Sequence, residues 1–202
     1  MLDFKTTSKM NMLVSLKYIS LVCLLLSMFG CSGTHRASKT AGSTGDPYDL
    51  LSVTLDGKKV NALEHDLMAL NHHSDKREAR QVAETALQAS AFLGEQYRLV
   101  RPPLLHNLLV QIGLRERGLC YHWTEDLMSY LRSLQLKSYQ LRWGVAYRGS
   151  DLREHNTVVI TANGQPFEEG LILDPWRYSG RLYWVIVKND SYPWCELPPE
   201  AW

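Results

Sequence analysis

The sequence contains no block of like charge and no glycine-rich loop, and both absences limit what the protein can bind. Its 202 residues include 22 basic and 21 acidic side chains, for a formal net charge of +1. Proteins that bind nucleic acid usually present a clustered basic face, so we expect no nucleic-acid partner. Without a glycine-rich loop to cradle a phosphate, we expect no cofactor. Cys120 and His122 lack the usual zinc-ligand spacing, so we expect no metal site.

No apolar run in the sequence reaches the length of about 20 residues that a bilayer-spanning helix needs. The run at 18–30 has 13 residues, follows three lysines and ends immediately before Cys31. This pattern is typical of an export signal. The ending "MFGC" resembles the lipobox of bacterial lipoproteins, which implies a signal peptide at 1–30 and acyl chains on Cys31 that attach the protein to a membrane. An uncleaved anchor and an ordinary cleaved signal are the alternatives.

The segment after Cys31 is small and polar, and it buries too little apolar surface to fold. We therefore expect a flexible tether over 31–48. Among lipoproteins, a serine such as Ser32 after the lipidated cysteine implies sorting to the outer membrane of the bacterial cell envelope, facing the periplasm. Residues 49–202 contain no repeat or low-complexity tract, and we expect them to form a single domain.

The first half of this domain has the periodicity of four helices, because apolar residues recur at spacings of three and four. Ser74 is the expected N-cap of the second helix, Pro102 and Pro103 precede the third, and Cys120 begins the fourth. The predicted buried stripes are Val60, Leu63, Leu67 and Leu70; Val82, Ala86, Ala89, Leu93 and Tyr97; Leu104, Leu105, Leu108, Leu109 and Ile112; and Trp123, Leu127, Tyr130, Leu131 and Leu134.

The second half has the pattern of strands. Apolar side chains alternate over 139–148, and short β-branched or aliphatic runs follow at 156–162, 170–176 and 181–187. We expect the C-terminal tail, which contains Cys195, to cover an edge of the sheet. Helices followed by strands, without alternation, favour an α+β fold with an antiparallel sheet.

A turn signal brings two polar residues of this half together. Asn163-Gly164 is a strong hairpin signal; His155 lies eight residues before Asn163, and Asp174 lies ten residues after Gly164. Nearly equal arms place the imidazole and the carboxylate at the same end of one hairpin. Pro166 and the irregular residues after it leave the register open.

Cys120 completes a set suited to nucleophilic catalysis. A thiol with a pKa near ~8.5 is mostly protonated at neutral pH. A helix N-terminus stabilises the thiolate, a histidine can accept the proton, and an acid can orient that histidine. Gly118 allows close approach of the backbone, so that the Cys120 N–H can face a developing oxyanion.

The motifs "RGLCYHWTEDL", "HNTVVIT" and "LILDPWR" resemble the transglutaminase-like branch of the papain-like cysteine enzymes, over about residues 104–190. The resemblance implies a cysteine peptidase or acyltransferase with Cys120 as nucleophile, His155 as general base and acid, and Asp174 as the orienting group. It also implies acyl transfer from a peptide or protein amide through a thioester, ending in hydrolysis or in transfer to an amine.

The sequence departs from the family pattern in two ways, and other readings stay open. His122 and Trp123 make the first helical turn bulky, and Gln111 lies too far upstream for the papain-type oxyanion position. The same fold could serve a non-catalytic lipoprotein that binds or scaffolds an unidentified partner. In an oxidising compartment, Cys120 and Cys195 could form a disulfide.

The flanking residues also have two readings each. Alone, His155 could be a strand-end histidine bonded to the backbone, and Asp174 a turn residue before Pro175. Trp176 could wall the site, and Arg177 is either a solvated charge or a substrate contact.

Overall fold

The computed structural model describes residues 54–150 and 153–202. Every described helix and strand belongs to one compact unit of the chain. The expected signal peptide, the lipidation site Cys31 and the tether lie outside the described residues. Among the helices that are described, none has the length and apolarity required to cross a membrane.

All four predicted helices are present: α2 (Gly57–Ala69), α3 (Lys76–Gln96), α4 (Pro103–Gln111) and α5 (Cys120–Arg132). The predicted N-cap of α3 was wrong by one residue. Asp75 has the extended backbone of an N-cap, and its carboxylate accepts the Glu78 N–H at 2.9 Å. Capping requires a side-chain acceptor two or three residues before a free N–H, and Asp75 meets this requirement, whereas Ser74 lies one residue outside it.

The sheet has five antiparallel strands in the order β4-β3-β2-β1-β5. They are β1 (Tyr139–Ala146), β2 (His155–Ala162), β3 (Leu171–Asp174), β4 (Tyr183–Ile186) and β5 (Trp194–Leu197). Four were predicted as strands. The tail that was expected to cover an edge does so as a fifth strand, β5, which pairs with β1. The predicted α+β class with an antiparallel sheet is confirmed.

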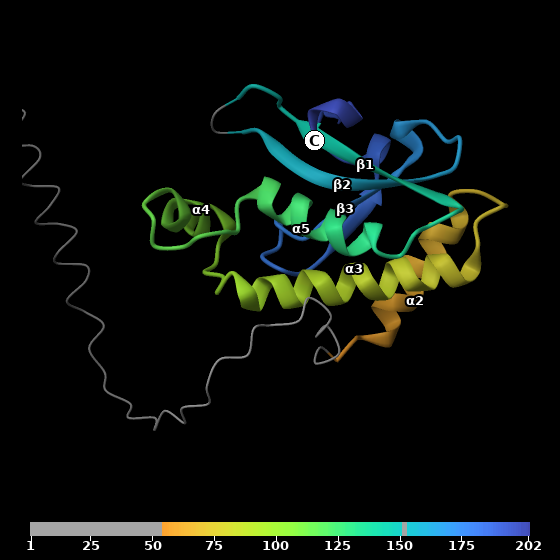
Figure 1. Ribbon diagram of the computed structural model, residues 1–202, viewed down its shortest axis with the longest axis horizontal. Helices are drawn as coiled ribbons and strands as arrows, with labels where there is room; N and C mark the ends of the chain where they lie inside the picture. Colours follow the sequence, from red (N-terminus) through yellow and green to blue (C-terminus); the bar gives the residue numbers. More distant parts are fainter. Residues whose placement is uncertain (1–53, 151–152) are drawn as a thin grey trace, which may run out of the picture. The chain divides into compact units, whose positions relative to one another are not determined.

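The helices stack in layers against one face of the sheet. Figure 1 shows α5 beneath β1 and β2, with α3 below it and α2 beyond. The predicted stripes of α2, α3 and α5 are buried, except that Leu70, Tyr130 and Leu134 are only partly buried. The largest fully buried members of the core include Trp123, Leu63, Leu67, Leu127, Met128, Leu131, Ile160, Leu171 and Leu173. The helices and the sheet bury these apolar side chains against one another. The unit therefore has a hydrophobic core of its own, as an independently folding domain does.

The opposite face of the sheet is covered too, which the alternation in β1 did not indicate. The short helix η2 (Phe167–Glu169) places Phe167 on a second apolar cluster with Val159 and Ile172. A side chain at Gly144 would meet Val159 at 3.0 Å and Phe167 at 3.5 Å. Gly144 and Ala146 are therefore buried rather than solvated.

The predicted buried stripe of α4 was wrong. Leu104, Leu105, Leu108 and Ile112 are exposed, and the helix buries His106 instead. The reason is the position of α4 at one end of the α3–α5 layer, away from the sheet (Figure 1). Helical periodicity shows that a face is apolar, but only the tertiary arrangement decides whether another element covers that face.

A buried carboxylate connects α3 to the start of the sheet. Glu78 accepts the N–H groups of Lys137 (2.9 Å) and Ser138 (2.8 Å) and the Ser138 hydroxyl (2.7 Å). Burial raises the pKa of the Glu78 carboxyl, but the Ser138 and Lys137 donors lower it by more, so the pKa lies below its ordinary value. The ionised form is therefore the form that stabilises the fold.

Replacing Glu78 with Gln should lower the free energy of unfolding by about 1–3 kcal/mol at neutral pH, since one oxygen acceptor and the charge are lost. The pKa of Glu78 is lower in the folded state. Its contribution is therefore present above the unfolded-state value of about 4.3 and is lost as the pH falls further. Urea unfolding at pH 7 and at pH 3.5 measures both effects. Glu84→Gln, on the exposed side of the same helix, is the control and should change stability far less. Equal losses from the two variants would contradict the assignment.

Candidate active site

Cys120 is the first residue of α5, and its side chain is half-buried. The N-cap residue, Leu119, makes no side-chain cap. In the described part of the chain, the N–H groups of Cys120 and Tyr121 have no protein acceptor. Such free N–H groups give a helix N-terminus its partial positive charge. The helix end therefore favours negative charge on the Cys120 sulfur or on an oxygen beside it.

His122 has a structural role in this turn. Its Nδ1 accepts the N–H groups of Gly118 (3.2 Å) and Leu119 (3.3 Å). Burial and the nearby Arg117 hold the pKa of His122 below its ordinary value, which keeps Nδ1 available as an acceptor. The bulky first turn thus caps the helix.

Within residues 54–150 and 153–202 no cluster of side chains could hold a metal ion.

Gly118 allows the chain to approach His106 before α5 begins. Its φ is +122°, and a Cβ at this position would lie 2.1 Å from His106 Nε2. The buried His106 ring accepts the Val100 N–H at Nδ1 (3.3 Å) and donates from Nε2 to the Arg117 carbonyl (2.9 Å). The Trp123 indole N–H donates to the Gly118 carbonyl at 3.1 Å. His106 and Trp123 therefore fix the backbone that leads into Cys120.

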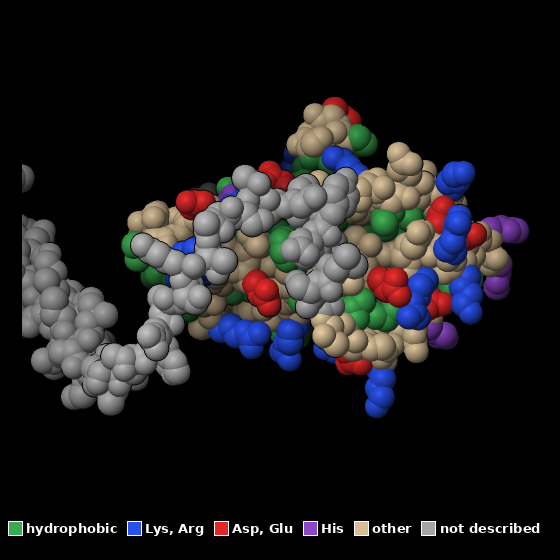
Figure 2. All heavy atoms as spheres, turned by 60° about the horizontal axis from the view of Figure 1, so that its bottom comes forward, with side chains coloured by type: hydrophobic (Ala, Val, Ile, Leu, Met, Phe, Trp, Pro, Cys, Tyr) green, Lys and Arg blue, Asp and Glu red, His purple; other side chains and the backbone are tan. Residues whose placement is uncertain are grey.

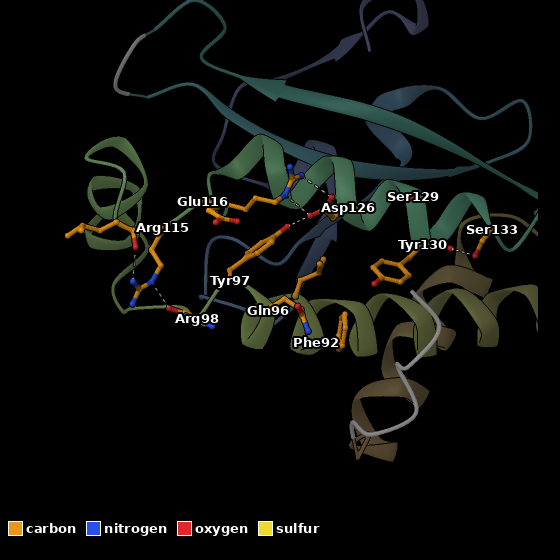
Figure 3. A pocket seen from close by; sticks show the side chains of 13 residues that line it. Phe92, Gln96, Tyr97, Arg98, Arg115, Glu116, Asp126, Ser129, Tyr130 and Ser133 are labelled. Atoms are coloured by element: carbon orange, nitrogen blue, oxygen red, sulfur yellow. Dashed lines mark hydrogen bonds and ion pairs between the residues drawn. The ribbon is translucent and has the colours of Figure 1, made fainter. Parts of the chain in front are cut away.

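Arg117 joins the same loop to the side of α5. Its guanidinium donates to both carboxylate oxygens of Asp126, at 3.1 and 2.9 Å, and to Glu125 at 3.0 Å. The Tyr97 hydroxyl donates to Asp126 from α3, and burial together with that carboxylate raises the pKa of the phenol. Arg117, Asp126 and Tyr97 line a cavity of about 760 Å³ between α3 and α5, shown in Figure 3. Cys120 does not line this cavity.

The structure brings His155 and Asp174 together at one end of the β2–β3 pair. His155 Nε2 lies 2.8 Å from Asp174 Oδ2, with 3% of His155 and 0% of Asp174 exposed. The register pairs Val158 with Leu173, which puts the first residue of β2 near the last residue of β3. The expected hairpin pairing is confirmed in its geometry, while the catalytic roles stay predictions.

Arg177 is not a solvated charge, because its side chain is largely buried and pairs with two carboxylates. Its Nε donates to Asp174 Oδ2 at 3.0 Å, its backbone N–H donates to Asp174 Oδ1 at 3.1 Å, and its two terminal nitrogens donate to Asp190 at 3.0 and 2.7 Å. Burial raises the pKa of Asp174, but His155 and Arg177 lower it by more. Asp174 is therefore ionised and has a fixed orientation.

Aromatic rings enclose His155. The ring centroids of Trp176, Trp194 and Tyr192 lie 4.7, 5.5 and 5.7 Å from that of His155. The Trp176 indole donates to Asn107 on α4 at 3.1 Å, and the Trp194 indole donates to Asp190 at 2.8 Å. Trp176 does wall the site. The enclosure excludes water around the imidazole, which strengthens its interaction with the two charged groups beside it.

Cys120 lies against the first residues of β2. Its Sγ is 3.8 Å from both the Glu154 carbonyl oxygen and the Asn156 side-chain nitrogen. The Trp143 indole donates to Asn156 Oδ1 at 2.7 Å, and this bond turns the Asn156 amide N–H towards the sulfur. His155 Nδ1 is buried and has no hydrogen-bond partner among the described residues. It is thus available for a proton shared with the thiol.

The ionisation of both groups reflects this proximity. Burial raises the pKa of the Cys120 thiol, but His155 and the N–H groups of Asn156 lower it by more, so the pKa lies below its ordinary value. Burial lowers the pKa of His155, but Asp174 and Cys120 raise it by more, to about 9. Each group therefore favours the charged form of the other, which promotes a pair of thiolate and imidazolium.

Cys195 does not pair with Cys120, and both are free thiols. Cys195 pairs with Val145 of β1, which pairs on its other side with Asn156 of β2. Strand β1 therefore separates Cys195 from the strand that contacts Cys120. The Cys195 thiol donates to the Val145 carbonyl at 3.2 Å. The structure therefore contradicts the alternative in which Cys120 and Cys195 form a disulfide.

Sequence reasoning missed three groups of this site: Asn156, Trp143 and Asp190. Asn156 directly follows His155, and because neighbouring residues of a strand normally point to opposite faces, strand periodicity gives no signal that both belong to one site. Trp143 had a signal only as an apolar strand residue. Asp190 lies in a loop, and its partner Arg177 comes from another loop, so no local spacing predicts the pair.

Comparison with known proteins found no matching family model, no similar curated protein and no similar solved structure.

Replacing Gly118 with Ala should destabilise the domain by about 3 kcal/mol or more, because the new Cβ overlaps the buried His106 ring and the backbone has positive φ. Gly113→Ala is the matched control, since Gly113 also has positive φ (+76°) but no atom within 4 Å of its Cβ position. It should cost about 1–2 kcal/mol. Thermal unfolding of both variants measures the difference. Similar losses would mean that His106 does not press on Gly118.

Proposed function

We propose that this protein is a thiol acyl-transfer enzyme with a transglutaminase-like core, acting on a peptide or protein amide of the bacterial cell envelope. One observation carries the proposal: the buried His155 bonds Asp174 through Nε2 and has no partner for Nδ1 among the described residues, while its two neighbours in the chain, Glu154 and Asn156, contact the Cys120 sulfur. A structural histidine would satisfy both nitrogens with backbone or solvent. This one is polarised towards a thiol at a helix N-terminus, which is the arrangement that nucleophilic catalysis needs.

Acylation would begin with the Cys120 thiolate attacking the carbonyl carbon of an amide. A C–S bond forms, and the carbonyl electrons move to the oxygen. The free N–H of Cys120 and the amide N–H of Asn156 are suited to stabilise that oxyanion. When the intermediate collapses, the C–N bond breaks and the proton on His155 Nδ1 passes to the leaving amine. A thioester and a neutral imidazole remain.

Deacylation would reverse these roles. The neutral His155 takes a proton from water or from an amine as that nucleophile attacks the thioester carbonyl. The C–S bond breaks, Cys120 leaves as a thiolate, and the imidazolium is restored. Water yields a carboxylic acid, and an amine yields a new amide. Throughout, Asp174 holds the ring orientation and balances the imidazolium charge, while Arg177 and Asp190 hold Asp174 in place.

We also propose that acyl chains on Cys31 attach the protein to the membrane and that the domain faces the periplasm. The lipobox-like ending of the apolar run supports this, together with the polar segment that follows. The attachment would keep the catalytic domain close to substrates of the envelope.

A non-catalytic binding role is the second candidate, and one observation favours it. The cavity of about 760 Å³ between α3 and α5 lies away from Cys120 and exposes Arg98 and Arg115 among its lining residues. The substitution Cys120→Ser separates the candidates. An enzyme would lose its physiological role with this variant, and a binding protein that uses the other cavity would keep it.

Iodoacetamide should alkylate Cys120 with a midpoint below the ordinary thiol value of about 8.5, because His155 stabilises the thiolate. In His155→Ala the midpoint should move to higher pH, since a buried thiol without the imidazolium favours the neutral form. Peptide mass spectrometry across pH 5–10 measures this, and Cys195, exposed in the same chain, controls for reagent quality. An unshifted midpoint in the histidine variant would contradict the ion pair.

Cleavage of peptide p-nitroanilides should follow a bell-shaped pH profile. The rising limb reflects formation of the thiolate. The falling limb should lie near pH 9, where His155 loses the proton that the leaving amine requires. Alkylation of Cys120 should instead stay at its plateau above pH 9, because it needs only the thiolate. Asp174→Asn should move the falling limb to lower pH, since the imidazolium loses its counter-charge. A limb that stays in place would argue against general acid catalysis by His155.

A further inference from the structure

Helix α4 and the residues that follow it expose an apolar face that is not part of the candidate active site. Seven large apolar side chains are exposed in the described residues, and five of them belong to this segment. They are Leu104 (68% exposed), Leu105 (41%), Leu108 (50%), Ile112 (57%) and Leu114 (62%). We call these five residues the α4 face. Apolar side chains are visible at the corresponding end of the domain in Figure 2.

None of the five residues of the α4 face belongs to, or packs against, a buried apolar cluster of the described residues. The one buried residue of α4 is His106, which bonds the Val100 N–H and the Arg117 carbonyl. The leucines stay in water, although contiguous exposed apolar surface of this kind usually marks a site of protein or membrane contact. The helix is thus anchored by a histidine and presents its apolar side outwards.

Three arginines next to the α4 face have no acidic partner among the described residues. Arg98 and Arg101 precede α4, and Arg115 follows it. The Arg115 side chain bonds two backbone carbonyls, those of Arg98 and Leu114, and Figure 3 shows Arg98 and Arg115 side by side below α4. Glu116 is the acidic side chain of the segment, so positive charge exceeds negative there. Arg117, by contrast, is neutralised by Asp126 and Glu125.

We propose that the α4 face docks onto an anionic lipid bilayer, with its leucines among the acyl chains and the three arginines at the phosphate groups. Leucine on one side and arginine around it is the composition of helices that lie in a membrane interface. Positive charge near the surface adds attraction to anionic headgroups.

The chain outside the described residues is long enough for this contact. Residues 32–53 separate Cys31 from Thr54, and an extended chain of that length spans up to ~75 Å. This step rests on the proposed lipid anchor, which would raise the local concentration of bilayer around the domain. The docking surface itself consists of described residues and does not depend on catalysis by Cys120.

Docking would orient the candidate active site towards the membrane. Asn107 of α4 accepts the indole N–H of Trp176, whose ring lies against His155. His106 supports the loop that leads into Cys120. A bilayer that holds α4 would therefore hold one wall of the site at the membrane surface, where substrates attached to the membrane are presented.

The test is co-sedimentation of the Gly45–Trp202 fragment, which lacks the apolar run and Cys31, with vesicles. We expect it to bind vesicles of equal phosphatidylglycerol and phosphatidylcholine at least about ten-fold more strongly than pure phosphatidylcholine vesicles, because the arginines need anionic headgroups. Leu105→Glu/Leu108→Glu should weaken binding about ten-fold or more. Arg101→Gln should weaken binding to the anionic vesicles alone.

Lys76→Glu is the matched control, because it also lowers the net charge by two, but at the exposed first residue of α3, whose opposite end leads to α4; it should leave vesicle binding within about two-fold, since it removes no apolar contact with the bilayer. Circular dichroism verifies that each variant is folded. Anionic vesicles that fail to sediment the native fragment would overturn the proposal, as would equal binding by the double glutamate variant. Self-association of the fragment that the same glutamates abolish, without vesicle binding, would also overturn it and would assign the face to a second copy of the chain.

Discussion

The buried hydrogen bond between His155 Nε2 and Asp174 is the interaction on which the candidate site depends. An ionised carboxylate with no solvent exposure is costly unless every oxygen is paired. Here Asp174 receives the imidazole, the Arg177 side chain and the Arg177 backbone N–H. Arg177 in turn is balanced by Asp190. A chain of alternating charges therefore extends from the end of β3 to the thiol, and its removal at any point would leave a buried charge unpaired.

The second constraint is the position of the sulfur at the beginning of α5. Gly118 and His106 set the approach of the chain, His122 caps the turn, and Arg117 joins the loop to Asp126 on the side of the helix. None of these residues is placed to react. Together they hold Cys120 against the first residues of β2 and leave its N–H free, so the helix end contributes to the electrostatics of the thiol.

The local sequence pattern was sufficient to predict those features that depend on residues close together in the chain. Periodicity predicted the four helices and four of the strands. One turn signal predicted that His155 meets Asp174, because residues at equal distances from a hairpin turn lie opposite each other. The α3 cap was missed by one residue, because serine and aspartate both cap helices and only the backbone conformation distinguishes Ser74 from Asp75. The disulfide was a reasonable alternative from cysteine counting alone. It fails because β1 lies between Cys195 and the strand that contacts Cys120.

The sequence by itself determined the α+β class, the position of Cys120 at a helix start and the pairing of a histidine with an aspartate. These features depend on residue type and on separations of a few positions. The tertiary structure alone decided that Asn156 and Trp143 join the site, that Asp190 neutralises Arg177 and that the leucines of α4 stay in water. Each of these depends on which elements pack together. Packing is set by the whole domain, because a side chain becomes buried only when a distant segment covers it.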